Sequence, residues 1–183
     1  MRILAGIFLC SFTAISFEIA LTRIFSISLW YHFAFMIVSI AMLGIGVSGT
    51  VLSLYPKLKS SKNLGIYALL LSLSVSLNYT IANFIPFDPV RLSWDKIQIL
   101  YIGVYYIVLC IPFFFFGLIV SASFTEFSEK SGSIYGADLL GAGTGSIAVI
   151  LLMSFLSPGQ TVFAVASSAA LGALLMGRKK AAA

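Results

Sequence analysis

Residues 98–122 read QILYIGVYYIVLCIPFFFFGLIVSA, an unbroken stretch in which no side chain carries a charge. A helix needs about 20 mostly apolar residues to cross the hydrocarbon core of a bilayer. This stretch is long enough to do so and too apolar to cover the surface of a soluble domain. It therefore predicts a membrane-spanning helix.

The composition of the whole chain indicates the same environment. Of the 183 residues, 60% are hydrophobic and only 9% are charged, whereas a soluble domain carries about 25% charged residues. Six segments meet or approach the length of a spanning helix: residues 3–23, 29–54, 64–85, 98–122, 135–157 and 160–177. Because only short polar breaks separate them, we expect an all-α membrane bundle of six helices over residues 1–178.

The distribution of basic residues predicts the orientation of this bundle. Cytoplasmic loops of membrane proteins carry an excess of Lys and Arg. With the N-terminus in the cytoplasm, eight basic residues fall on the cytoplasmic side: Arg2, Lys57, Lys59, Lys62, Lys130, Arg178, Lys179 and Lys180. Three fall outside: Arg23, Arg91 and Lys96. We therefore expect both termini in the cytoplasm and a multi-pass protein of the bacterial inner membrane.

The two ends of the chain allow other interpretations. Met1 and Arg2 precede an apolar stretch, as in a secretory signal. That stretch is longer than a signal usually has, however, and Glu18 interrupts it where cleavage would occur. Residues 179–183, KKAAA, form a basic tail that could be a cloning scar or an unidentified sequence. The chain could also have been cut where a further domain begins.

Two glycine-rich stretches look like cofactor loops. Residues 138–145, DLLGAGTG, are similar to the loop that holds S-adenosylmethionine in class I methyltransferases, and residues 44–49, GIGVSG, match the dinucleotide fingerprint. Such loops work at the turn between a strand and a helix, whereas both stretches lie within predicted spanning segments. We expect no cofactor and no nucleic-acid partner.

Small residues have a different use in a bilayer, because they allow the backbones of two helices to approach closely. Glycines recur along faces of the second and fifth segments: Gly44, Gly46, Gly49, Gly141 and Gly145. We expect these glycines to pack helices together, and their faces to contact a partner chain or a second copy.

Three ionisable residues lie in the predicted outer half of the first two helices. Glu18 lies well inside the first helix, where a charge is costly and is usually functional or paired. Arg23 follows five residues later, about 140° around the helix, and His32 is near the start of the second segment. These residues could form a polar site or proton path, or a structural pair, and Arg23 could simply extend to the headgroups.

Other polar residues could join that site. Asn78 and Tyr105 fall on the same outer side, near the end of the third helix and the start of the fourth, and are further candidates to line a substrate or ion path. Asp138 is interpreted as a structural acid near the start of the fifth helix, where negative charge is favourable. Pro112 predicts a kink in the fourth helix and a freed backbone carbonyl.

Residues 17–49, FEIALTRIFSISLWYHFAFMIVSIAMLGIGVSG, and residues 135–146, YGADLLGAGTGS, carry a family resemblance. Glu18 followed by Leu-Thr-Arg, a glycine-rich second helix, and Asp138 in a small-residue helix after a tyrosine resemble the membrane domain of bacterial spermidine-synthase-like proteins. In that family a hydrophobic helical region precedes a cytoplasmic aminopropyltransferase-like domain. The resemblance implies a membrane module without that catalytic domain, so it does not imply aminopropyl transfer by these residues.

We therefore expect a non-catalytic module that acts as a subunit or anchor of a larger membrane assembly. The alternative is a transporter-like or channel-like half-bundle, since six helices make half of a twelve-helix carrier. An intramembrane enzyme has the least support, because the sequence shows one histidine, no metal-ligand spacing and no nucleophile with an adjacent base. A carrier should show a hydrated cavity that reaches Glu18, whereas an anchor should hold Glu18 in a closed ion pair.

Overall fold

The computed structural model describes residues 1–28, 32–82, 84–88, 90–91 and 94–177. Over these residues the chain forms six long helices: α1 (Arg2–Ser28), α2 (His32–Leu54), α3 (Leu64–Ala82), α4 (Ile97–Glu126), α5 (Ser131–Phe155) and α6 (Pro158–Gly177). Short 3-10 turns lie between some of them: η1 (Pro56–Lys59), η2 (Ser61–Asn63) and η4 (Ser128–Lys130). Each long helix includes a stretch that is long and apolar enough to cross a membrane. The predicted all-α fold class with six spans is confirmed.

Several helices extend beyond the predicted apolar segments. α1 continues to Ser28 instead of ending near Arg23, and within this extension Ser26 Oγ donates to the Arg23 carbonyl (3.1 Å). α5 begins at Ser131, four residues before the predicted start. The reason is that hydropathy marks only the hydrocarbon core, whereas a helix can continue through the headgroup layer.

Two helices end earlier than predicted: α5 ends at Phe155 and not at residue 157, and α3 ends at Ala82 and not at residue 85. The chain turns at this point, with Phe84 N donating to the Ile81 carbonyl (2.9 Å). Pro86 lies close behind, and a proline disfavours the helical conformation in the residue before it. The apolar pattern alone did not reveal this stop.

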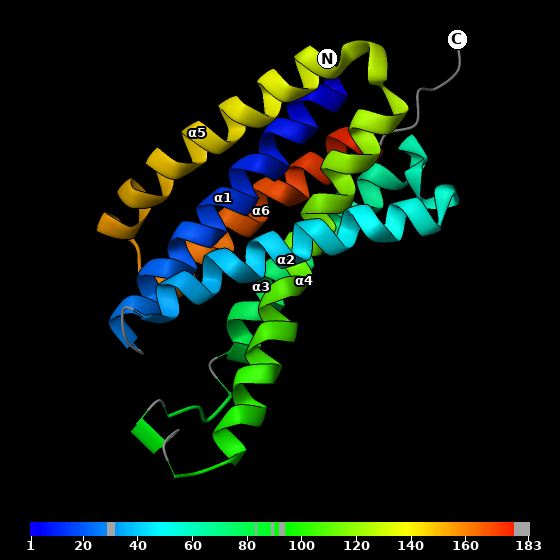
Figure 1. Ribbon diagram of the computed structural model, residues 1–183. Coiled ribbons are helices and arrows are strands. Elements are labelled where there is room, and N and C mark those ends of the chain that lie inside the picture. The colour runs from blue at the N-terminus through cyan, green and yellow to red at the C-terminus, as the bar shows by residue number, and fades with distance from the viewer. Residues whose placement is uncertain (29–31, 83, 89, 92–93, 178–183) are drawn as a thin grey trace.

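α1 lies at the centre of the bundle, packed against α5 and α6 and more lightly against α2 (Figure 1). α2 packs along α4, and α3 packs against both α4 and α6. α5 lies at the edge of the bundle, with nearly all of its contacts made to α1. Only 17% of the apolar window of α5 is buried, against 50% for α1, so most of α5 faces the surroundings of the chain.

The first residues of α1 and the last residues of α6 lie at the same end of the bundle (Figure 1). Gly6 there adjoins Met176, Gly65 adjoins Gly177, and Ser61 Oγ donates to Glu126 Oε1 (3.1 Å). Basic residues of the described part that gather at this end are Arg2, Lys57, Lys59, Lys62 and Lys130. Arg23, Arg91 and Lys96 lie at the opposite end, so the described members of the two predicted groups are separated in space. Arg178, Lys179 and Lys180 lie outside the described residues. Which end faces the cytoplasm stays a prediction.

Candidate functional site

Three of the predicted packing glycines lie where two helix backbones meet. A Cβ on Gly145 would be 2.7 Å from the Phe12 carbonyl oxygen, and one on Gly141 would overlap the Phe8 carbonyl still more severely. Gly44 is similar on α2, where a Cβ would be 2.8 Å from the Cys110 carbonyl oxygen of α4. At these positions a side chain would force the helices apart.

Gly46 and Gly49 lie differently. A Cβ at either residue would meet no atom within 4 Å, and Gly46 is exposed. The described part of the chain therefore places Gly44 inside the bundle, against α4, and leaves Gly46 and Gly49 on an open surface of α2. Periodicity along the sequence did not distinguish these two situations.

The α1–α5 contact includes an acid in the interior of a helix. Ser11 Oγ donates to Asp138 Oδ1 (2.5 Å), and nearby Ser16 Oγ donates to the Gly145 carbonyl (2.9 Å). Because α5 begins at Ser131, Asp138 lies two turns into the helix, beyond the first turn in which the helix dipole favours an acid. The predicted position of Asp138 at the helix start is thus corrected, and its contact in the structure is the serine of α1.

Glu18 lies on nearly the same face of α1 as Ser11. The two residues are seven apart, which corresponds to about 10 Å along the axis and about 20° around it. Glu18 is half-buried, and across the described residues its carboxylate makes no ion pair or side-chain hydrogen bond. Two carboxyl groups therefore lie along one stripe of α1. One is that of Glu18, and the other is that of Asp138 on α5, which accepts a hydrogen bond from Ser11.

The structure does not bring the predicted trio of Glu18, Arg23 and His32 together in its described part. Arg23 is exposed and forms no ion pair with Glu18. His32 is the first residue of α2, but its side chain lies outside the part of the chain that is described. A closed ion pair around Glu18 is therefore not seen among the described side chains.

Asn78 and Tyr105 lie in the contact between α3 and α4. Pro112 is buried within α4 and has no N–H to donate to the carbonyl of Val108, four residues before it. Asn78 Nδ2 of α3 donates to that Val108 carbonyl instead. Asn78 is 2% exposed, and its Oδ1 finds no partner in the described part of the chain. Asn78 therefore donates to the carbonyl that Pro112 was predicted to leave without a partner.

Tyr105 joins the same two helices about one turn nearer to the start of α4. Its hydroxyl donates to the Ala82 carbonyl at the end of α3 (2.9 Å). Its ring meets Phe25 of α1 and Phe87 edge-on, with centroids 5.5 and 5.8 Å apart. The contacts seen for Asn78 and Tyr105 tie helices together, and neither residue contacts the Glu18 carboxylate by a hydrogen bond.

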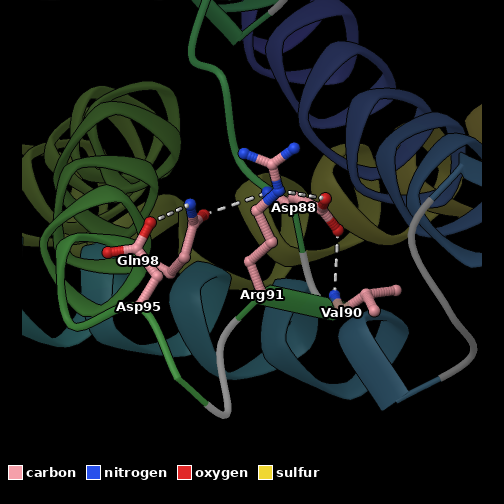
Figure 2. Close-up of polar contacts among 5 residues, drawn as sticks. All are labelled: Asp88, Val90, Arg91, Asp95 and Gln98. Carbon is pink, nitrogen blue, oxygen red and sulfur yellow. Dashed lines mark hydrogen bonds and ion pairs between the residues drawn. The ribbon is translucent and has the colours of Figure 1, made fainter.

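The connection between α3 and α4 is organised by one buried amide (Figure 2). Gln98, 3% exposed, accepts from the Asp88 N–H (3.0 Å) and donates to Asp95 Oδ2 (3.3 Å). Asp88 in turn pairs with Arg91 (3.2 Å) and accepts from the Val90 N–H (2.9 Å). Gln98, in the first turn of α4, thus ties the middle of the connection to the start of that helix.

Two apolar hollows run along α4. One, about 520 Å³, lies on α4 alone between Lys96 and Ile107. The other, about 300 Å³, lies between α4 and α2 and begins at the same Ile107. Glu18 lines neither hollow, so neither is the hydrated cavity expected of a carrier.

Sequence reasoning missed several residues that make these contacts. Ser11 was not singled out, although it precedes Glu18 by seven residues and so shares its face. Gly117 was also missed; a Cβ there would overlap Ser48 Oγ and lie 2.9 Å from Ile45 Cα. In the sequence Gly117 is a single glycine after four phenylalanines. It was missed because no other glycine lies at the four-residue spacing that two glycines of α5 show.

The chemistry available at the α1–α5 stripe is that of carboxyl groups with hydroxyl donors. The described residues contain no group of three His, Cys, Asp or Glu side chains that could hold a metal ion. Cys10 and Cys110 are free thiols, the first fully buried. Such a stripe can accept hydrogen bonds, pair with a cation or carry a proton. No protein-family model, curated protein or solved structure matches the chain.

Proposed function

We propose that the chain is a non-catalytic subunit or anchor of a larger membrane assembly, and that a partner helix docks beside Glu18 on α1. The observation that carries this proposal is a half-buried carboxylate inside a spanning helix without an ion pair or side-chain hydrogen bond among the described residues. Ionisable groups at membrane depth almost always pair with another group. A basic or amide side chain on a partner helix would supply that pair.

Open glycines on two helices support the same proposal. Gly46 and Gly49 on α2 and Gly143 on α5 leave room for a Cβ with no atom within 4 Å. Each costs about 1 kcal/mol of helix propensity relative to alanine and makes no close contact in the described chain. In lipid, small residues of this kind allow a second helix to approach. The edge position of α5 leaves its outer face accessible to such a helix.

The alternative is a transporter-like or channel-like half-bundle with a polar site around Glu18, Arg23 and His32. It is favoured by a second carboxyl group, that of Asp138 on α5, which contacts Ser11 on the same stripe of α1 as Glu18. Two carboxyl groups about two turns apart could pass a cation or a proton between them. This alternative needs a hydrated route to Glu18, and the two apolar hollows along α4 do not supply it.

The assignment to the spermidine-synthase-like family is part of the proposal and rests on the sequence resemblance alone. In that case the partner would include a cytoplasmic aminopropyltransferase-like domain, and both termini would face the cytoplasm of a bacterial inner membrane. The separation of basic residues between the two ends of the bundle is compatible with that orientation.

The test is native mass spectrometry of the protein purified in a mild detergent, in its own form and as Glu18→Gln. We expect a partner chain in fixed stoichiometry that dissociates from Glu18→Gln, because the substitution removes the charge that the partner pairs with. Glu129→Gln is the matched control, since Glu129 is exposed at a helix end, and it should keep the partner.

Two other outcomes would contradict the subunit proposal. A protein without any partner chain that carries a small molecule or ion, released by Glu18→Gln, would favour the transporter alternative. A partner that stays equally bound to both variants would show that Glu18 is not the docking residue.

A further inference from the structure

The hollow along the first turns of α4 is a shallow, wide-open apolar depression on one face of that helix. It is lined by Ile99, Leu100, Val104 and Ile107, with Lys96 at one end. Gly103 also lines it, and a Cβ there would meet no atom within 4 Å. The missing side chain thus widens the hollow at its middle.

The length of α4 sets the depth of this hollow in the bilayer. Its 30 residues correspond to about 45 Å, which matches a bilayer including both headgroup layers. Lys96 precedes the first residue of α4 and therefore lies at the level of the headgroups. From Lys96 to Ile107 the helix rises about 16 Å, close to the half-thickness of a hydrocarbon core of about 30 Å.

The charge at the mouth of the hollow is a cation without an ion pair. Asp88 pairs with Arg91. Asp95 accepts from the Ile97 N–H (3.1 Å) and from Gln98 (3.3 Å), so both acids of the connection are engaged within it (Figure 2). Across the described residues Lys96 forms no ion pair. Its ammonium is therefore available to a phosphate at the membrane surface.

We propose that this hollow binds one anionic phospholipid, with its phosphate at Lys96 and an acyl chain along Ile99, Gly103 and Ile107. A phospholipid joins a negative headgroup to an apolar chain of one leaflet's length, which are the two features of the hollow. A helix of a second copy fits less well, because its apolar side chains would lie against the Lys96 ammonium. The site does not involve Glu18.

The test adds an equimolar mixture of phosphatidylglycerol and phosphatidylethanolamine with identical acyl chains to delipidated protein in detergent. Native mass spectrometry then counts the bound lipids, and we expect one phosphatidylglycerol to be retained in preference. Lys96→Gln should reduce this preference about fivefold, the effect of one lysine close to an anionic surface. Gly103→Leu should reduce retention of both lipids, because its side chain would project into the middle of the hollow.

Matched controls exist for both substitutions. Lys62→Gln removes an exposed cation from the opposite end, and Gly143→Leu adds a side chain at another open glycine; both should retain the lipid. Val104→Phe narrows the same hollow and replaces Gly103→Leu if that variant aggregates.

The proposal is overturned if the protein shows no preference for phosphatidylglycerol, or if Lys96→Gln leaves the preference unchanged. A dimer that Gly103→Leu converts to a monomer would assign the hollow to a second copy of the chain instead.

Discussion

At the scale of single residues, Pro112 removes one backbone hydrogen bond from α4 and Asn78 provides a substitute from α3. A carbonyl without a partner is expensive at membrane depth, because no water is available to replace the lost donor. The amide of Asn78 is thus best understood together with the proline, and its burial follows from that contact. The loss of protein stability on replacing Asn78 should therefore depend on whether Pro112 is present.

This dependence can be measured in a double-mutant cycle. We expect Asn78→Ala to destabilise the protein by about 1–3 kcal/mol, since it leaves the Val108 carbonyl inside a spanning helix without a donor. Pro112→Ala restores an N–H to α4, so Asn78→Ala in that background should cost clearly less. Thermal unfolding in one detergent, followed by circular dichroism, compares the four proteins. Additive effects would mean that Asn78 acts independently of the proline.

At the scale of helices, the α1–α5 pair depends on two glycines and a serine–acid contact. Since α5 makes nearly all of its contacts with α1, any loss at this interface is not compensated elsewhere in the described bundle. The same helix also carries Gly143 on its open side. A substitution at Gly141 on the packed side of α5 can therefore be compared with the same substitution at Gly143 on its open side.

We expect Gly141→Ala to destabilise the protein by about 1–3 kcal/mol, because the new Cβ overlaps the Phe8 carbonyl and separates two backbones. Gly143→Ala adds the same methyl group in open space and should be neutral or stabilising by up to about 1 kcal/mol through helix propensity. Melting temperatures of the two variants decide the matter. Equal effects of both substitutions would argue against close packing of α1 on α5.

At the scale of the whole molecule, two groups of charged residues lie at opposite ends of a bundle of six spans. The end that gathers the starts of α1, α3 and α5 with the ends of α4 and α6 holds more basic residues than the other. The excess of Lys and Arg predicts that this end faces the cytoplasm. Accessibility to a reagent that cannot cross the membrane can test this prediction.

The measurement uses single cysteines in a background with Cys10→Ala and Cys110→Ala. We expect Val90→Cys to react with an impermeant maleimide in intact cells, because Val90 is exposed at the end opposite the termini. Lys57→Cys, exposed at the end that holds the termini, should react only after the membrane is opened. Reversed labelling would invert the orientation, and labelling of both sites from one side would contradict six spans.

Much of the architecture could be read from the sequence, whereas the contacts could not. Long apolar segments predicted six helices, and Pro112 predicted a freed carbonyl. The donor to that carbonyl was not predicted, because Asn78 lies 30 residues before Val108 and no local pattern connects them. Likewise, Ser11 and Asp138 are 127 residues apart in the chain.

By itself, the sequence determined that the protein is an all-α membrane bundle, because a bilayer core of about 30 Å requires apolar helices of a known minimum length. Which face of each helix lies inside became known only from the packing of the six helices against one another. In water the buried face of a helix is marked by its apolar stripe, but in lipid both the interior and the outer surface are apolar. For this reason Gly44 and Gly46 look alike in the sequence, and only the neighbouring helix α4 distinguishes a packed glycine from an open one.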